Sequence, residues 1–352
     1  MLYPLKFEPV YKDYIWGGRE LAKFGKDLPE GIVAESWEIS GHPDGEGIVA
    51  NGEYKGISLT ALIKKLGRDL VGYKLEEKDV EKFPLLIKLI DANDRLSVQV
   101  HPEDEYAQVH ENGEYGKNEM WYIVEAKEGA KIVYGVKPGT TRESFAKAVK
   151  EDRIEDCLNY IEVKTGDAVN IPAGLVHAIG AGILIAEIQQ NSNTTYRVFD
   201  YNRTDKNGNK RPLHIEKALD VINFENCNVK GKLKPLEIKL DDKSSKKYLV
   251  ANKYFSVEKY SIDGTIKENA DGERFFTYTC FDGEGEISFN GGKETIKRGQ
   301  SILIPAALGE YEISGKLELV KSCVPNLEKD VIAPLEKAGY SKEEVLSQVV
   351  TA

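Results

Sequence analysis

One sequence pattern occurs twice in this chain, and the repetition limits what the chain can fold into. Residues 166–177 run from a glycine through an apolar stretch to Pro-x-Gly and end on His177. Residues 299–310 repeat the glycine-to-proline spacing and the apolar alternation, with alanine for the second glycine and Glu310 for the histidine. Because each copy reads as a strand that enters a tight turn, the pattern predicts two related β-units.

Hairpin-like strands precede each copy, over residues 121–135 and 276–289. If the two copies are aligned on these strands, Phe275 takes the place of Glu119. The second unit would then keep the fold and lack the polar residues of the first. The predicted fold class is mainly β, with two β-barrel or jelly-roll units.

The length of 352 residues favours more than one domain. We expect residues 1–230 to form the first β-unit, with small helical segments at about 57–72 and 140–158. We expect residues 231–325 to form the second unit, because the boundary is expected in the segment 228–247, which is rich in lysine and poor in apolar residues. Residues 326–352 form a helical tail.

Local capping signals mark the predicted helices. Ser58 can cap a helix that Gly67 ends. Thr140 and Glu143 have capping-box spacing, and Ser341 begins the helix of the tail with the same spacing to a glutamate.

The net charge of −10 and the pI near 5.3 argue against a nucleic acid or an anionic membrane as partner. No apolar run approaches the ~20 residues that span a bilayer, and the first residues do not resemble a secretory signal. The cysteines are scattered without a CxxC pair, which favours reduced thiols and a cytoplasmic location. They are Cys157, Cys227, Cys280 and Cys323.

Alternation along the strand-like segment 96–101 places Ser97, Gln99 and His101 on one face. His101, Glu119 and His177 supply the two histidines and one carboxylate that a catalytic metal site requires, and Gln99 could add an oxygen. The same ligand types bind ferrous iron in oxygenases, so residue type leaves the metal open. The remaining histidines are interpreted as structural: His42, His110 and His214.

Four segments in this order resemble the type I mannose-6-phosphate isomerases, zinc enzymes of the cupin superfamily, and most closely their short bacterial form. The resemblance covers about residues 1–320 and rests on residues 97–102, 117–119, 172–178 and 196–197. It implies reversible isomerisation of mannose 6-phosphate and fructose 6-phosphate through an enediol(ate).

The resemblance also implies the roles of ten residues and one Zn²⁺ per chain. Where the long family members carry an acidic residue, this chain has Asn193. The implied metal shell is Gln99, His101, Glu119 and His177. The implied catalytic arginine is Arg197, and the implied substrate cavity contains Lys88, Ser97, Lys117, Glu187 and, at a lysine position of the long form, Arg203.

The proton carrier is open between Glu187, on an apolar strand, and Lys117, because either can reach a pKa near ambient pH. Phosphate donors are expected in Lys88, Ser97 and Arg203. Two other interpretations remain: a metal-dependent cupin oxygenase, and a cupin that binds sugar without catalysis. The expected partner is a small phosphorylated sugar, and the chain is expected to be a monomer or a homodimer.

Overall fold

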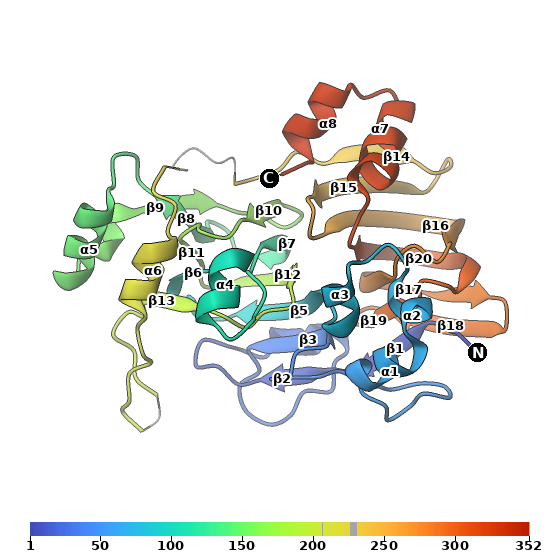
Figure 1. Cartoon of the computed structure of the whole chain (residues 1–352), viewed down its shortest axis with the longest axis horizontal. Helices are drawn as coiled ribbons and strands as arrows, with labels where there is room; N and C mark the ends of the chain where they lie inside the picture. Colours follow the sequence, from blue (N-terminus) through green and yellow to red (C-terminus); the bar gives the residue numbers. More distant parts are fainter. Residues whose placement is uncertain (206, 226–230, 352) are drawn as a thin grey trace.

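The computed structural model describes residues 1–205, 207–225 and 231–351, and the strands form three sheets (Figure 1). One sheet has six strands in the order β10-β7-β12-β5-β3-β2, and another has five in the order β13-β6-β11-β8-β9. The six are β2 (Val10–Lys12), β3 (Glu35–Ser40), β5 (Leu85–Ala92), β7 (Glu119–Ala126), β10 (Ala168–Ile171) and β12 (Ile183–Gln190). The five are β6 (Val98–Val100), β8 (Lys131–Val136), β9 (Leu158–Glu162), β11 (His177–Ile179) and β13 (Tyr196–Phe199).

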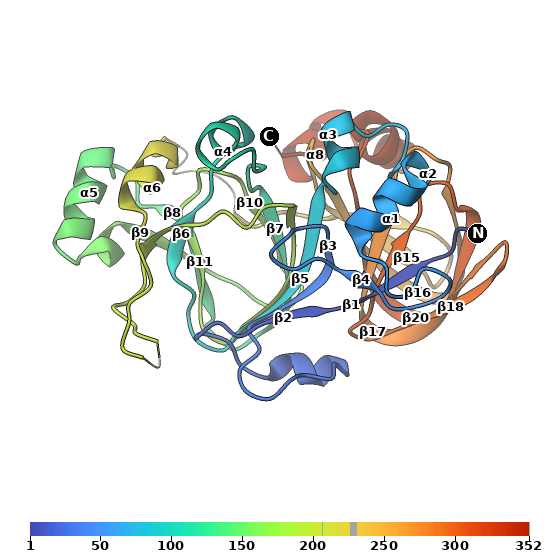
Figure 2. The same cartoon turned by 60° about the horizontal axis from the view of Figure 1, so that its bottom comes forward.

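An apolar core fills the space between these two sheets, which face each other in Figure 2. Trp121 and Ile123 of β7 and Ile185 of β12 pack there with Ile132 and Tyr134 of β8. The mainly β fold is confirmed, and it has the jelly-roll form: in the described part of the chain the strands do not close into one barrel.

Strand β5 lies between β12 and β3, so both of its edges are hydrogen-bonded. All eight of its residues are buried, which explains its nearly continuous apolar sequence. Lys88 is the exception in the middle of the run, and it is 3% exposed. The polar turn after β5 carries the chain to β6 in the other sheet. β7 and β8 also lie in different sheets, so the expected first hairpin does not form.

The third sheet contains the second repeat and has nine strands. Strand β1 pairs with β19 and with β4, so the first residues of the chain complete this sheet. The boundary expected at residue 230 lies at the edge of the undescribed residues 226–230. The strands are β1 (Leu5–Glu8), β4 (Ile48–Val49), β14 (Leu236–Lys239), β15 (Ser245–Ala251), β16 (Ser256–Ala270), β17 (Phe276–Phe289), β18 (Gly292–Lys297), β19 (Ser301–Ile304) and β20 (Gly309–Cys323).

Six strands of this sheet, in the order β14-β15-β16-β20-β17-β19, correspond one by one to the six-stranded sheet read from its other end, β2-β3-β5-β12-β7-β10. The match extends to the register. Trp37 of β3 pairs with Lys88 of β5, and Tyr248 of β15 pairs with Glu258 of β16. An irregularity in the pairing follows Trp37 and Tyr248 alike. The repeated sequence pattern therefore reflects two β-sheets with matched pairing.

The register corrects two expectations about the second copy. Ile171 pairs with Glu119, and Ile304, its counterpart in the repeat, pairs with Phe276. Phe276 rather than Phe275 therefore stands in place of Glu119. The second expected hairpin is instead the single strand β17, which is long enough to run through both predicted segments.

The two sheets differ in the sign of their buried charges. Lys88 pairs across β5 and β12 with Glu187, whereas Glu258 pairs across β16 and β20 with Lys321. Glu35, two residues before Trp37, lies 3.9 Å from the Lys88 ammonium. At the matching place two residues before Tyr248, Lys246 lies 2.8 Å from the carboxylate of Glu258. These three charges of the first sheet, on Glu35, Lys88 and Glu187, thus have opposite charges at the matching positions of the second.

Helices pack against the sheets, and those over residues 142–150 and 215–221 share an apolar cluster with β6, β8, β11 and β13. The Ser58 cap of α1 is confirmed, since its hydroxyl accepts from Ala61 N–H and Gly67 ends the helix. The cap of α5 is one residue later than expected, because Thr141 and Ser144 bond each other reciprocally. The regular helices are α1 (Leu59–Leu66), α2 (Arg68–Val71), α3 (Glu77–Glu81), α4 (Asp104–His110), α5 (Arg142–Lys150), α6 (Ile215–Val221), α7 (Ala333–Lys337) and α8 (Lys342–Gln348). Shorter 3₁₀ segments span Glu20–Phe24 and Ile154–Cys157, and a π-helical turn spans Leu327–Ile332.

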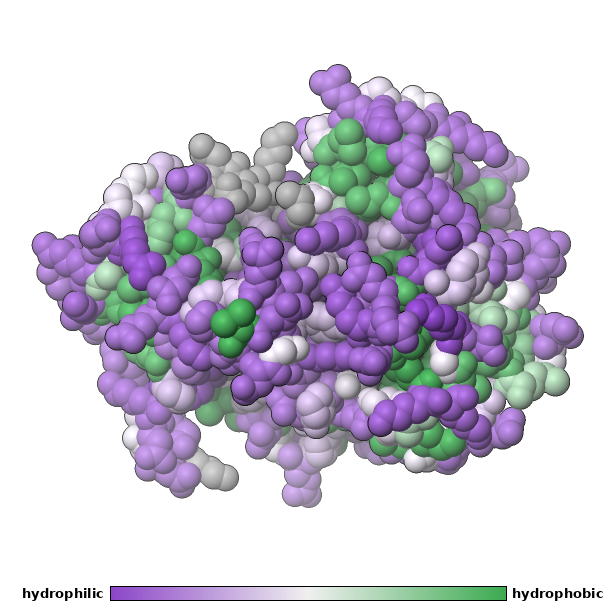
Figure 3. Space-filling model, viewed as in Figure 1, coloured by the Kyte–Doolittle hydropathy of each residue, from purple (hydrophilic) through white to green (hydrophobic). Residues whose placement is uncertain are grey.

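The C-terminal tail thus holds more than the single expected helix, and it packs on β14 and β15 through one apolar cluster. No helix among the described residues has the length and apolar character to cross a bilayer. The face seen in Figure 3 is mostly hydrophilic, with hydrophobic side chains in small separate groups. Cys157, Cys280 and Cys323 are free thiols, and Cys227 lies outside the described residues.

Candidate active site

The fold brings together the three side chains that the sequence singled out as metal ligands. His101 follows β6, Glu119 begins β7 and His177 begins β11, and each is 1% exposed. One ligand atom from each lies within 4.8 Å of the others. Nε2 of His101 is 3.2 Å from Oε1 of Glu119, and Nε2 of His177 is 3.9 Å from Oε2. The three side chains therefore converge on one point.

The protonation states suit metal binding. Burial, and then the Lys117 ammonium, lower the pKa of His101 to about 3, and burial lowers that of His177. Burial raises the pKa of Glu119, but Lys117 and then His101 outweigh it and hold that pKa well below its usual value. Two neutral imidazoles and one carboxylate form a donor set that fits a divalent cation.

The backbone fixes the ring of His177. Its Nδ1 bonds the carbonyl of Leu175 at 2.8 Å, which leaves Nε2 toward Glu119. Gly174, in the turn before it, has φ +80° and donates its N–H to the carbonyl of His101 at 2.9 Å. This hydrogen bond ties the Pro/Gly turn, which leads into the strand of His177, to the backbone of His101.

Asn118 connects three parts of the site. Its side-chain oxygen accepts from Ala173 N–H at 3.0 Å, and its backbone and side-chain N–H groups donate to Oε1 of Gln190 in β12. Asn118 is 7% exposed, so these bonds are shielded from water. They position the neighbouring Lys117 and Glu119.

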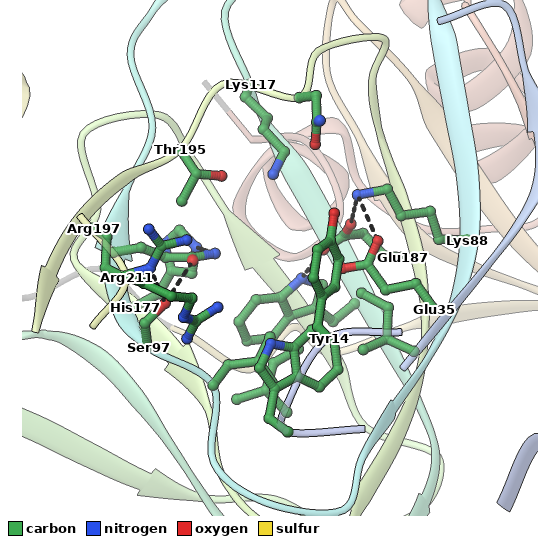
Figure 4. Close-up of a pocket in the computed structure, with 17 residues that line it drawn as sticks. Tyr14, Glu35, Lys88, Ser97, Lys117, His177, Glu187, Thr195, Arg197 and Arg211 are labelled. Atoms are coloured by element: carbon green, nitrogen blue, oxygen red, sulfur yellow. Dashed lines mark hydrogen bonds and ion pairs between the residues drawn. The ribbon is translucent and has the colours of Figure 1, made fainter. Parts of the chain in front are cut away.

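A pocket of about 250 Å³ opens onto this cluster (Figure 4). It contains Lys88, Ser97, Gln99, Lys117, His177, Glu187 and Arg197 of the predicted site residues. The structure adds residues that the sequence analysis missed. They are Tyr14, Trp16, Glu35, Ile90, Leu96, Trp121, Ile179, Thr195 and Arg211, and the pocket also includes Asn193.

Lys88 and Glu187 form a buried ion pair at one side of the pocket, with 2.9 Å between Nζ and Oε1. Burial lowers the pKa of Lys88, but the carboxylates of Glu187 and Glu35 outweigh burial and raise it. Burial, and then the Glu119 carboxylate, raise the pKa of Glu187. The indole N–H of Trp121 contacts both Glu119 and Glu187, at 3.1 and 3.0 Å.

Lys117 lies directly at the ligand cluster. Its ammonium is 2.9 Å from Oε1 of Glu119 and 3.3 Å from Nε2 of His101. Gln99 is also close, since it pairs with His177 across β6 and β11 and its amide nitrogen lies 3.4 Å from Nε2 of that histidine.

Arg197 faces the pocket from β13, opposite Gln99 in the register. Its Nε donates to the hydroxyl of Ser97 at 3.1 Å, and Nη1 donates to the carbonyl of Pro212 at 3.0 Å. Among the described residues no carboxylate pairs with this guanidinium. Burial, and then the positive charge of Arg211, lower the pKa of Arg197.

Of the predicted site residues, His101 and Glu119 belong to the ligand cluster without lining the pocket, and Arg203 lies outside both the cluster and the pocket lining. Its guanidinium bonds Asp200, Asp94 and the carbonyl of Arg95. The other three histidines lie outside the pocket lining. They are His42 in a turn, His110 at the end of α4 and His214 at the N-cap of α6.

Some of the missed residues follow from alternation. Trp121 lies two residues after Glu119, so both point to the same face of β7. Arg211 carries no such signal, because it lies in a loop whose path the sequence does not reveal.

Comparisons with known proteins agree with this geometry. Residues 4–137 match the family model described as phosphomannose isomerase type I, catalytic domain. Residues 244–324 match the model described as mannose-6-phosphate isomerase, cupin domain.

Relatives align over nearly the whole chain. Mannose-6-phosphate isomerase ManA of Bacillus subtilis is 39% identical over 319 residues, which cover 91% of this chain and 98% of the relative. The mannose-6-phosphate isomerase of Streptococcus mutans is 38% identical, with 92% and 98% covered. The crystal structure of a mannose 6-phosphate isomerase from Bacillus subtilis superposes with a TM-score of 0.84 at 36% identity, covering 91% of this chain and 99% of that one. This chain belongs to the type I mannose-6-phosphate isomerase family.

Proposed function

We propose that this enzyme interconverts mannose 6-phosphate and fructose 6-phosphate. The observation that carries the proposal is the convergence of His101 and Glu119 on His177, which lines a pocket together with Glu187 and Arg197. The names of the relatives support the same reaction.

The metal we propose is one Zn²⁺ per chain, held by His101, Glu119 and His177, with Gln99 as a fourth ligand. Zinc accepts this mixture of imidazole and carboxylate and has no redox chemistry, which suits an isomerisation. When bound, the cation supplies electrostatic stabilisation for the negative charge that develops on the sugar oxygens.

For proton transfer we propose Glu187. Its carboxylate would take the proton from C2 of the open-chain aldose and return it to C1, while the hydroxyl proton moves from O2 to O1 in the enediolate, so the substrate gains and loses no atoms. The raised pKa makes it a stronger base than an ordinary carboxylate. The role proposed for Lys117 is to donate hydrogen bonds to the sugar oxygens near the metal, because its ammonium is already held by Glu119 at 2.9 Å.

Arg197 is proposed to stabilise the enediolate, since its charge is permanent and no carboxylate within the described residues neutralises it. Ser97 orients Arg197 through its hydroxyl. Lys88 is proposed to orient Glu187 and to contact the substrate at that side of the pocket.

We further propose how the chain is divided into units. Residues 1–230 carry the catalytic unit, 231–325 the second cupin-like unit and 326–352 the tail, with β1 completing the second sheet. We place the enzyme in the cytoplasm as a monomer or homodimer, on the basis of the acidic composition and the scattered cysteines.

A coupled assay tests the function. Fructose 6-phosphate formed from mannose 6-phosphate is measured with the zinc-loaded enzyme, before and after chelation, together with Arg197→Ala. We expect turnover that chelation abolishes and that Arg197→Ala reduces by at least 100-fold. Absence of turnover in the zinc-loaded enzyme would contradict the proposal, and oxygen consumption would favour an oxygenase.

A further inference from the structure

The pocket contains four cations, and three of them are paired with carboxylates. Lys88 lies 2.9 Å from Glu187 and 3.9 Å from Glu35, so a phosphate beside it would meet two carboxylates. Lys117 is paired with Glu119. The two pocket arginines lie together on the opposite side (Figure 4). Arg211 is paired with Asp200, but Arg197 has no carboxylate partner among the described residues, so the arginine pair keeps a positive charge.

Arg211 is held so that part of its guanidinium is free. Its Nε and Nη2 donate to the two oxygens of Asp200 at 2.8 and 2.5 Å. No hydrogen bond or ion pair within the described residues uses Nη1. Asp200 itself is 5% exposed. Burial raises the pKa of Asp200, but the hydrogen bonds from Arg211 and Arg203 outweigh burial and lower it, so Asp200 is an anion that fixes Arg211.

Arg203 contacts the same aspartate, and each of its three guanidinium nitrogens has a partner. Its Nη2 bonds Asp200 at 2.6 Å, its Nε bonds the Asp200 carbonyl at 3.3 Å, and its Nη1 bonds the carbonyl of Arg95 at 2.6 Å. It therefore supports Asp200 from outside the pocket.

On the basis of the proposed function, we infer that Arg211 binds the phosphate of the sugar and that Asp200 is its positioning residue. The phosphate then lies at the arginine side of the pocket and not beside Lys88 or Arg203. Arginine offers a fork of donors that matches phosphate oxygens, and here the fork is fixed before the substrate arrives. Specificity for a phosphorylated sugar follows from this fixed charge.

The test compares Arg211→Gln with Arg95→Gln in the zinc-loaded enzyme. Arg95 lies near the same loop, stacks on Tyr201 and does not line the pocket, so its loss removes one positive charge without a direct contact. We expect Arg211→Gln to raise the KM for mannose 6-phosphate about 10- to 100-fold with kcat within about threefold, as for a lost charged hydrogen bond. Arg95→Gln should change KM less than about threefold.

Two further variants separate charge from geometry. Arg211→Lys should recover only part of the loss, and Asp200→Asn should raise KM with little effect on kcat. An unchanged KM in Arg211→Gln, or a loss confined to kcat, would overturn the inference.

Equilibrium titration with mannose 6-phosphate distinguishes a failure of this inference from a failure of the proposed function. If the wild-type enzyme binds the sugar without converting it, weaker binding by Arg211→Gln still supports the phosphate contact, and equal binding overturns it.

Discussion

Trp121 and Glu187 are joined by a hydrogen bond of 3.0 Å from the indole N–H to Oε2. The same N–H lies 3.1 Å from Glu119, so one donor contacts both the proposed metal ligand and the proposed base. Trp121 is 1% exposed, and water cannot replace it without rearrangement. The proposed metal site and the proposed proton-transfer site therefore share one hydrogen-bond donor, and a change in the position of Trp121 would affect both.

Trp121→Phe removes this donor and keeps most of the ring. A hydrogen bond to a charged group contributes about 1.5–3 kcal/mol, so kcat/KM should fall about 10- to 100-fold. The measurement is steady-state kinetics with zinc content in parallel. Tyr134→Phe is the control, because it removes a buried hydroxyl that donates to the Asn170 carbonyl and does not line the pocket. Equal losses in both variants would indicate a general packing effect.

Glu187→Gln should lower kcat by about 10²- to 10⁴-fold, since the amide cannot accept the proton. Circular dichroism and zinc content should stay unchanged. Glu125→Gln makes the same substitution on β7 at a half-exposed position and should change kcat less than about twofold. Retained turnover in Glu187→Gln would transfer the role of base to Lys117.

Removal of either histidine ligand should release the metal. We expect His101→Ala and His177→Ala to lose zinc by elemental analysis and to lose turnover, and zinc should restore a chelated wild-type enzyme. His110→Ala, at the exposed end of α4, serves as the control and should keep its zinc content and its turnover. Full zinc content in a ligand variant would exclude that residue from the metal site.

Glu268 tests the second sheet. It lies 2.8 Å from the Lys321 ammonium and accepts from the Tyr260 hydroxyl at 2.7 Å. Glu268→Gln leaves Lys321 without this charge and should lower the free energy of unfolding by about 3 kcal/mol. The exposed pair of Lys267 and Glu312 is the control. Glu312→Gln should change the free energy of unfolding by less than about 0.5 kcal/mol.

The same glutamate predicts a pH dependence. Burial raises the pKa of Glu268, but Lys321 outweighs burial, so the folded-state value lies below the ordinary 4.5. The folded protein then binds fewer protons than the unfolded chain, and stability rises with pH across this interval. The contribution is complete above pH 4.5 and disappears as the pH falls through the folded-state value. Urea unfolding below pH 4.5 should therefore show a shrinking difference between wild type and Glu268→Gln.

The ligand residues could be predicted because strand alternation and the Pro/Gly turn fix their directions locally. His177 follows a turn whose spacing is visible in the sequence, and Gln99 shares a strand face with Ser97. Arg211 could not be predicted, because its position depends on a loop and on its bonds to Asp200.

The fold class could be predicted from the repeated pattern, whereas strand partners could not. β5 and β6 are neighbours in sequence but lie in different sheets, and only the packing of the two sheets decides this. The one-residue error at Phe275 and Phe276 has a similar cause, since sequence spacing does not report register.

The reversed charges of the two matched sheets show that strand geometry and interior chemistry can be inherited separately. At three matched positions acid and base are exchanged between the two sheets, while the ladder of backbone hydrogen bonds keeps the same pairing. For an engineer, the C-terminal half is thus a scaffold whose strands are already aligned for a second catalytic centre, and its buried cations are the first groups that would have to be replaced.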